Sequence, residues 1–251
     1  MKIEGCVALV TGANRGLGKA FAEALLDRGA SKVYAGMRDP STGSGADPRL
    51  VPLQLDVTST RDVAAVAARC TDLTLLVNNA GAMLMTPMLK DDSDSALRRE
   101  MEVNVYGVLA LTRAFAPILG SNGGGAIVNT GSIGSMVGQL KTPAYIASKG
   151  AIALLTKTLA LDYGRDHIRV NCLCPGITDT PMLRQHLGTG PEGEENIRKR
   201  ISRVPLGSIL TPEDLARAAL YLVSEDSAGI TGITHVVDGG LLAAAEYNVP
   251  L

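Results

Sequence analysis

A tyrosine and a lysine lie four positions apart in the segment TPAYIASKGA, at Tyr145 and Lys149. In a helix such residues project from the same face, so the two side chains are expected to be neighbours. A free tyrosine hydroxyl has a pKa of about 10 and transfers protons poorly at neutral pH. A nearby ammonium favours the tyrosinate, and a drop of ~3 pKa units, which needs about 4 kcal/mol, brings the hydroxyl close to ambient pH. The pair is therefore predicted to be an acid/base device in which Lys149 lowers the pKa of Tyr145.

Two further polar residues fit the same chemistry. Ser132 closes an apolar, strand-like segment, and its hydroxyl is suited to hydrogen-bond a substrate oxygen as charge develops there. Asn104 lies in the middle of a predicted helix, a position that asparagine does not favour by propensity. For each residue taken alone, the alternative is a satisfied polar group with no chemical role.

A glycine-rich loop, TGANRGLG, follows the first apolar segment and contains Gly12, Gly16 and Gly18. Glycines there let the backbone turn tightly and approach a pyrophosphate, which then sits on the positive end of the following helix. A plain glycine-rich turn is the alternative. The strand before the loop and the helix after it favour dinucleotide binding.

The segment VYAGMRD ends the second predicted strand, where an acidic residue often binds a free ribose 2′-hydroxyl. This chain has Arg38 there, with Asp39 one place later and Arg15 in the glycine loop. Two guanidinium groups favour a 2′-phosphate, because charge-assisted bonds to phosphate are strong. NADP(H) is therefore the preferred cofactor. The alternative is NAD(H), with Asp39 on the ribose and Arg38 as a surface charge.

Apolar runs of strand length alternate with helix-period segments along the whole chain. This alternation predicts a doubly wound, Rossmann-type α/β fold with a seven-stranded parallel sheet covered on both faces. The predicted strands are 6–12, 32–38, 50–57, 73–81, 124–132, 168–176 and 232–240, and the predicted helices are 18–29, 60–70, 95–119, 142–164 and 211–224. Thr142-Pro143 and Thr211-Pro212 are read as helix starts, and Gly29 and Gly164 as helix ends.

No repeat or linker divides the chain, so residues 1–251 are predicted to form a single dinucleotide-binding and catalytic domain. The connection 38–50 is rich in Pro and Gly and is expected to be a loop without a crossover helix. The segment 178–205, rich in Gly and charge, follows the sixth strand at a carboxyl edge where open α/β sheets bind ligands. It is predicted to be a mobile substrate lid, with a solvated surface insertion as the alternative.

Composition narrows the functional classes. Hydrophobic residues make up 46% of the chain, charged residues 20%, and the net charge is −1 with no basic block, so nucleic acid and anionic membrane surfaces are not expected partners. We find no signal-peptide pattern and no segment near the ~20 apolar residues that span a bilayer, which favours the cytoplasm. The three histidines are far apart in sequence, so no metal site is predicted. Buried, reduced thiols are expected at the cysteines, which are Cys6, Cys70, Cys172 and Cys174.

Seven motifs occur in one order: TGANRGLG, LDV, NNAG, VNVYG, NTGS, YIASK and CPGITDT. Together with the closing VVDGG, this order resembles the compact, single-domain branch of the short-chain dehydrogenase/reductase family over essentially the whole chain. The resemblance implies a nicotinamide cofactor, a catalytic group of Asn104, Ser132, Tyr145 and Lys149, and a basic Arg38 that marks NADP users. It also implies that Asn104 bends its helix through a backbone or water contact that links Lys149 to solvent.

The resemblance further implies a set of residues around the cofactor. Asp56 is expected to contact the adenine, Lys149 the nicotinamide ribose and Thr180 the carboxamide. The full cofactor-binding set comprises Gly12, Asn14, Arg15, Gly16, Leu17, Gly18, Arg38, Asp56, Val57, Asn79, Ala80, Gly81, Tyr145, Lys149, Pro175, Gly176, Thr178 and Thr180. Met83, Met85 and Met88 are suited to line an apolar substrate pocket or to fill the core.

The predicted function is an NADP(H)-dependent carbonyl reductase or alcohol dehydrogenase, in which Tyr145 exchanges a proton with the substrate oxygen. The alternatives are an NAD-dependent alcohol dehydrogenase of the same family, a non-catalytic dinucleotide sensor, and an epimerase or dehydratase that uses the same Tyr and Lys. The partner is a small carbonyl or alcohol substrate, and no arginine or lysine cluster is recognisable at its pocket. Family members commonly form homotetramers or dimers through the long helices at 95–119 and 142–164.

Overall fold

A seven-stranded sheet forms the centre of the computed structural model, which describes residues 1–43, 47–88, 93–188 and 190–243. The strands are β1 (Val7–Thr11), β2 (Lys32–Met37), β3 (Leu50–Gln54), β4 (Leu75–Asn78), β5 (Gly125–Thr130), β6 (Ile168–Pro175) and β7 (Thr234–Val237). All neighbours pair in parallel in the order β3-β2-β1-β4-β5-β6-β7. The predicted doubly wound fold is confirmed, and the strand order reverses between β1 and β4, where such sheets bind ligands.

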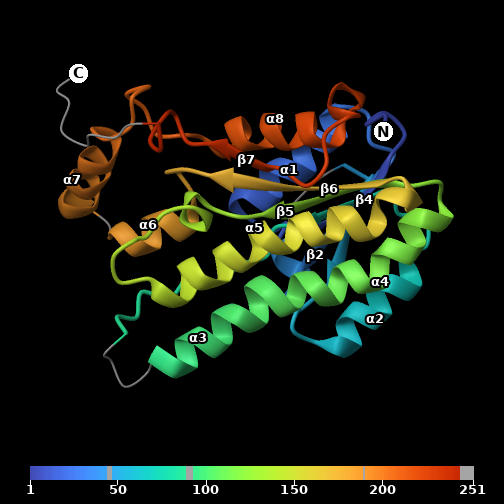
Figure 1. Cartoon of the computed structure of the whole chain (residues 1–251), viewed down its shortest axis with the longest axis horizontal. Coiled ribbons are helices and arrows are strands. Elements are labelled where there is room, and N and C mark those ends of the chain that lie inside the picture. The colour runs from blue at the N-terminus through green and yellow to red at the C-terminus, as the bar shows by residue number, and fades with distance from the viewer. Residues whose placement is uncertain (44–46, 89–92, 189, 244–251) are drawn as a thin grey trace.

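Helices cover both faces of the sheet (Figure 1). They are α1 (Gly16–Asp27), α2 (Thr60–Arg69), α3 (Ser93–Met101), α4 (Gly107–Ser121), α5 (Pro143–Tyr163), α6 (Pro181–Leu187), α7 (Gly190–Ile201) and α8 (Pro212–Val223). Side chains alternate between the faces along each strand. Ala8 and Val10 of β1 pack with α1 and α8, whereas Leu9 between them packs with α2, α4 and α5.

The helix predicted at 95–119 is continuous, but its regular α-helical hydrogen bonding is interrupted once. A π-helical turn, η2 (Glu102–Tyr106), separates α3 from α4 and contains Asn104. The run Ser93–Ser121 is long and apolar enough, by length and composition, to cross a membrane, because its most apolar 18-residue window has a mean hydropathy of 1.4. The expectation that no segment reaches that length was therefore wrong. Because 56% of its most apolar window is buried inside the protein, the run has the character of a core helix.

Helix boundaries follow the local signals in part. Thr211 starts α8 with a capping box shared with Asp214, as its Thr-Pro sequence predicts. Thr142 precedes α5, but its hydroxyl donates to the Gln139 carbonyl and does not cap the helix, so that prediction was wrong in its mechanism. Gly164 does not end α5 in a left-handed conformation either, because the chain continues into a 3₁₀ turn that ends at His167, with φ of 59°.

One connection agrees with expectation and one does not. Between β2 and β3, the described residues contain only a 3₁₀ turn, η1 (Pro40–Thr42), as predicted for a loop. The segment after β6 forms the two helices α6 and α7, which lie together beyond one end of the sheet (Figure 1). Its composition concealed them, although Thr180-Pro181 carries the same start signal as the other Thr-Pro pairs, and Thr180 Oγ1 accepts from Leu183 N.

Candidate active site

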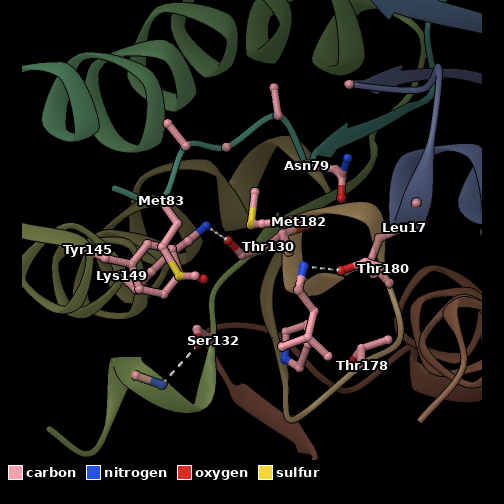
Figure 2. Close-up of a pocket in the computed structure, with 18 of the residues that line it drawn as sticks. Leu17, Asn79, Met83, Thr130, Ser132, Tyr145, Lys149, Thr178, Thr180 and Met182 are labelled. Carbon is pink, nitrogen blue, oxygen red and sulfur yellow. Dashed lines mark hydrogen bonds between the residues drawn. The ribbon is translucent and has the colours of Figure 1, made fainter. Parts of the chain in front are cut away.

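A cavity of about 890 Å³ opens at the carboxyl ends of the strands. It extends from the glycine loop to the helices α6 and α7, and its wall includes every residue of the predicted catalytic and cofactor sets except Gly18 and Asn104. Tyr145 and Lys149 of α5 lie together in this cavity, with Ser132 on the neighbouring segment (Figure 2). The fold therefore gathers motifs from both halves of the chain around one space, while the roles assigned to them stay predictions.

The glycine loop has the form of a phosphate cradle. Gly12 adopts φ of +67°, and a Cβ at that position would lie 3.2 Å from Ala80 Cα. Gly18 faces away from the cavity, because a Cβ there would lie 2.2 Å from the Gly12 carbonyl oxygen. Gly18 therefore lets α1 pack closely on the loop, and the N-terminus of α1 at Gly16 borders the cavity. This backbone fits a pyrophosphate.

The end of β2 presents cations to the same cavity. Arg15 and Arg38 are exposed and line it, together with Asn14. Asp39 Oδ1 accepts hydrogen bonds from the Ser41 backbone N–H, at 3.0 Å, and from the Ser41 hydroxyl, at 2.6 Å. The Asp39 carboxylate thus caps the turn η1, which occupies one of its two oxygens.

Asp56 follows β3 and lines the cavity, but its side chain is partly engaged within its own turn. Asp56 Oδ1 accepts from the Thr58 backbone N–H, at 2.9 Å, and from the Thr58 hydroxyl, at 2.7 Å. The charges of Arg38 and Arg99 act on this carboxylate. Arg99 of α3 also lines the cavity, and the sequence analysis did not include it.

Lys149 is held by the backbone of β5. Lys149 is 5% exposed, and its Nζ donates to the Thr130 carbonyl oxygen at 2.7 Å (Figure 2). Burial lowers the pKa of Lys149 to about 8, against the opposing influence of Cys172, Cys174 and Glu100. The ammonium is therefore readily titratable near neutral pH.

The tyrosine differs from expectation. Burial raises the pKa of Tyr145 to about 12, although a hydrogen bond with Ser132 lowers it in part. The Lys149 ammonium lies 5.7 Å from the centre of the Tyr145 ring and bonds to Thr130, so it does not offset the desolvation of the hydroxyl. The prediction that Lys149 lowers this pKa was therefore wrong for the protein alone, in which Tyr145 is a neutral phenol at neutral pH.

Hydrogen bonds to the backbone hold the side chains of Ser132 and Asn104 in place. Ser132 Oγ accepts from Gly134 N at 3.1 Å, which holds the serine at the start of a 3₁₀ turn (Figure 2). Asn104 is 1% exposed and binds the backbone of Ala82 in both directions, which agrees with the implied backbone contact. Among the described residues, Asn104 forms no direct hydrogen bond with Lys149.

Glu100 is a buried acid that the sequence analysis missed. It lies one helical turn before Asn104 and is 0% exposed. One carboxylate oxygen accepts from Leu84 N, and the other, Oε2, has no hydrogen-bond partner among the described residues. Burial raises the pKa of Glu100, while the Leu84 N–H and the charge of Lys149 lower it in part. Its only sequence signal is a glutamate at an apolar position of the helical pattern.

Residues of α6 and α7 line the end of the cavity away from the glycine loop. Met83 and Met85 line it, but Met88 does not and is 64% exposed. Arg200 and Arg203 also line it, so the expectation of no recognisable arginine cluster at the pocket was wrong. The sequence could not reveal this, because only the register of α7 decides which of its basic residues faces inward. All four cysteines are free and buried, as predicted.

Known proteins resemble this chain along nearly its entire length. The family model described as enoyl-(acyl carrier protein) reductase matches residues 12–242. A 2-(S)-hydroxypropyl-CoM dehydrogenase of Xanthobacter autotrophicus is 35% identical, over 96% of this chain and 98% of its own.

Two solved structures share the fold. A short-chain dehydrogenase of Burkholderia cenocepacia in complex with NADP is 37% identical, with a TM-score of 0.80 over 97% of this chain and 95% of its own. A gluconate 5-dehydrogenase of the same species, in complex with NADP and tartrate, is 29% identical, with a TM-score of 0.87 over 97% of this chain and 98% of its own. Taken with the fold and the ordered motifs, these matches mean that the chain belongs to the short-chain dehydrogenase/reductase family, oxidoreductases that act on alcohols and ketones.

Proposed function

We propose that this protein is an NADP(H)-dependent oxidoreductase that interconverts a ketone and a secondary alcohol, with Tyr145 as the acid/base. The observation that carries the proposal is the cavity itself. Tyr145, Lys149 and Ser132 line the same space as the glycine cradle of Gly12 and Gly16. A dinucleotide on that cradle extends toward the proton-transferring groups, which is the arrangement that hydride transfer to a carbonyl requires.

The residues have separate tasks in this proposal. The nicotinamide, when bound, supplies or accepts the hydride. Tyr145, neutral at physiological pH because burial raises its pKa to about 12, donates its proton to the ketone oxygen. Ser132 hydrogen-bonds the same oxygen as negative charge develops on it. Lys149, anchored on the Thr130 carbonyl, binds the nicotinamide ribose and supplies positive charge beside the tyrosine.

The preference for NADP(H) over NAD(H) rests on the end of β2. Arg15 and Arg38 line the cavity there, and guanidinium groups bind phosphate through bidentate, charge-assisted bonds. Asp39, the residue best suited to a free ribose hydroxyl, caps its own turn through Ser41. Solved relatives that hold NADP support the same preference.

The other expectations enter the proposal unchanged. Residues 178–205 serve as the substrate lid, the protein works in the cytoplasm, and it forms a homo-oligomer. The oligomer is supported by large apolar side chains on the outer surfaces of α4 and α5: Leu109 is 36% exposed, Leu154 is 67% exposed and Leu161 is 83% exposed. Exposed apolar surface of this kind commonly marks an interface between copies.

The direct test is oxidation of NADPH, followed by absorbance, with a panel of small ketones and with NADH in parallel. We expect turnover with at least one ketone and a lower KM for NADPH than for NADH. Tight NADPH binding without turnover of any ketone or secondary alcohol would instead support the dinucleotide sensor. A lower KM for NADH would support the NAD-dependent alternative, in which Asp39 binds the free ribose hydroxyl.

A further inference from the structure

Two arginines line the lid end of the cavity. Arg200, in the last turn of α7, and Arg203, just after it, both line the cavity. Within the described ranges, the only carboxylates in the cavity wall are Asp39 and Asp56. These follow β2 and β3, on the far side of β1, β4 and β5 from the lid, which follows β6.

Arg200 is the more enclosed of the two arginines. It is half-buried, and burial together with the neighbouring charge of Arg203 lowers the pKa of its guanidinium. No carboxylate of the described chain forms an ion pair with it. The nearby acids of α7 are engaged elsewhere, since Glu194 pairs with Arg184, and Glu195 pairs with Arg198 and Lys199.

The helix dipole explains only part of this arrangement. Cations are stabilised near the C-terminus of a helix, and this suits Arg198 and Lys199, whose side chains are 66% and 70% exposed. It gives no reason for Arg200 to turn inward, where a half-buried cation loses hydration and is repelled by Arg203. A ligand anion removes both costs.

Arg200 also lies close to the part of the cavity that leads to the catalytic residues. Its charge lowers the pKa of His186 on α6, after the larger effect of burial, and His186 hydrogen-bonds the backbone of Met83. Met83 lines the same cavity as Tyr145. A substrate molecule can therefore present its carbonyl to Tyr145 and extend another group toward the lid.

We propose that Arg200, assisted by Arg203, binds an anionic group of the substrate, remote from the reacting carbon. The shared chemistry is an oxyanion with two or three equivalent oxygens, as in a carboxylate, a sulfonate or a phosphate ester, which a guanidinium binds in a bidentate manner. This inference rests on the proposed function and names the class of its substrate: an oxoacid or hydroxyacid, or a sulfonate or phosphate equivalent.

Binding of small, unreactive probes tests the site without catalysis. We would titrate butyrate, propanesulfonate and propyl phosphate into the protein by calorimetry, with NADPH present to fill the cofactor site, and use butyramide as the neutral match for butyrate. We expect at least one anion to bind more tightly than butyramide. The relative affinities of the three anions show whether the site prefers a carboxylate, a sulfonate or a phosphate. Arg200→Gln should lower the affinity for that anion about 10- to 100-fold, which is the range for the loss of a charge-assisted hydrogen bond.

Two variants serve as controls. Arg198→Gln removes a cation from the exposed side of the same helix and should leave anion binding unchanged. Arg200→Lys keeps the charge but loses the bidentate fork, so its anion affinity should lie between those of the wild type and Arg200→Gln. Thermal unfolding confirms that each variant is folded. The inference is overturned if anions bind no more tightly than butyramide, or if Arg198→Gln and Arg200→Gln weaken them equally.

Kinetics separate this inference from the proposed function. With levulinate and its methyl ester as matched ketones, Arg200→Gln should raise KM for levulinate about 10- to 100-fold and leave the ester unchanged. An equal rise for both ketones would overturn the anion site. A third outcome is that the wild-type protein reduces neither ketone while the Arg200→Gln variant still loses anion binding. In that case the anion site stands and the proposed function fails for these ketones.

Discussion

Asn104 donates a buried hydrogen bond of 2.9 Å from its Nδ2 to the hydroxyl of Ser148, the residue before Lys149. The same amide binds the Ala82 backbone, with Nδ2 donating to the carbonyl oxygen at 2.9 Å and Oδ1 accepting from the N–H at 2.8 Å. One side chain thus joins the π-helical turn, the segment after β4 and helix α5. This arrangement sets the position of Lys149 relative to the cavity.

Replacement of Tyr145 by phenylalanine should remove the proton donor and keep the ring in place. We expect turnover of a ketone to fall at least about 100-fold, because general acid catalysis contributes about 10²- to 10⁴-fold. NADPH binding, followed by fluorescence, should persist. Tyr163→Phe, at the far end of α5 and outside the cavity wall, is the matched control. Unchanged turnover in Tyr145→Phe would end the proposal for this residue.

The pH dependence of ketone reduction should report Lys149. Burial lowers the pKa of Lys149 to about 8, so its ammonium is charged below that pH and neutral above it. Tyr145, with its pKa raised to about 12 by burial, stays protonated throughout this range. We therefore expect kcat/KM to fall as pH rises through about 8. Lys149→Met should leave a low activity without this descending limb, and a wild-type profile that is flat to pH 10 would contradict the assignment.

Cofactor preference should depend on Arg38. Replacement by aspartate introduces repulsion toward a 2′-phosphate and offers a carboxylate to a free ribose. We expect KM for NADPH to rise about 10- to 100-fold and KM for NADH to fall, measured with one ketone at saturation. Arg61→Asp, an exposed arginine of α2 outside the cavity wall, controls for the change of net charge. If the preference does not move, Arg15 or Asp39 determines it.

The pH dependence of stability should reflect Glu100. Burial raises the folded-state pKa of this carboxyl above its unfolded value, so the folded chain binds its proton more tightly. The associated stability is present below the unfolded pKa and is lost as pH rises through the folded pKa. Glu100→Gln removes that titration. The Tm of the variant minus the Tm of the wild type should therefore increase as pH rises from 4 to 8. If the two plots of Tm against pH are parallel, the pKa of the Glu100 carboxyl is not raised in the folded protein.

Assembly should depend on the outer face of α5. Leu154→Lys combined with Leu161→Lys places two cations on this apolar surface, and a charge in an apolar interface is strongly unfavourable. We expect sedimentation to show a smaller species than the wild type. Leu206→Lys alters an equally exposed leucine, 75% exposed, away from α4 and α5, and should leave the mass unchanged. An unaltered mass in the α5 variant would remove this face from the interface.

Most of the secondary structure could be predicted because its signals are local. The seven strands read as apolar runs, and each occurs within its predicted range. The glycine loop and the spacing of Tyr145 and Lys149 also belong to one short segment each. Helices α6 and α7 escaped prediction, because the segment is rich in glycine and charge and shows no clear apolar periodicity, although α7 buries Gly193 and Ile197.

The sequence by itself determined the fold class, the residue types at the candidate catalytic positions and the glycine loop, because each depends on side-chain periodicity or on contacts within a few residues. Only the tertiary structure decided the electrostatics. Burial, a property of the whole packed domain, reversed the expected pKa of Tyr145 and enclosed the carboxyl of Glu100. The register of α7 beside the cavity turned Arg200 inward, and so placed a cation where the substrate is expected to bind.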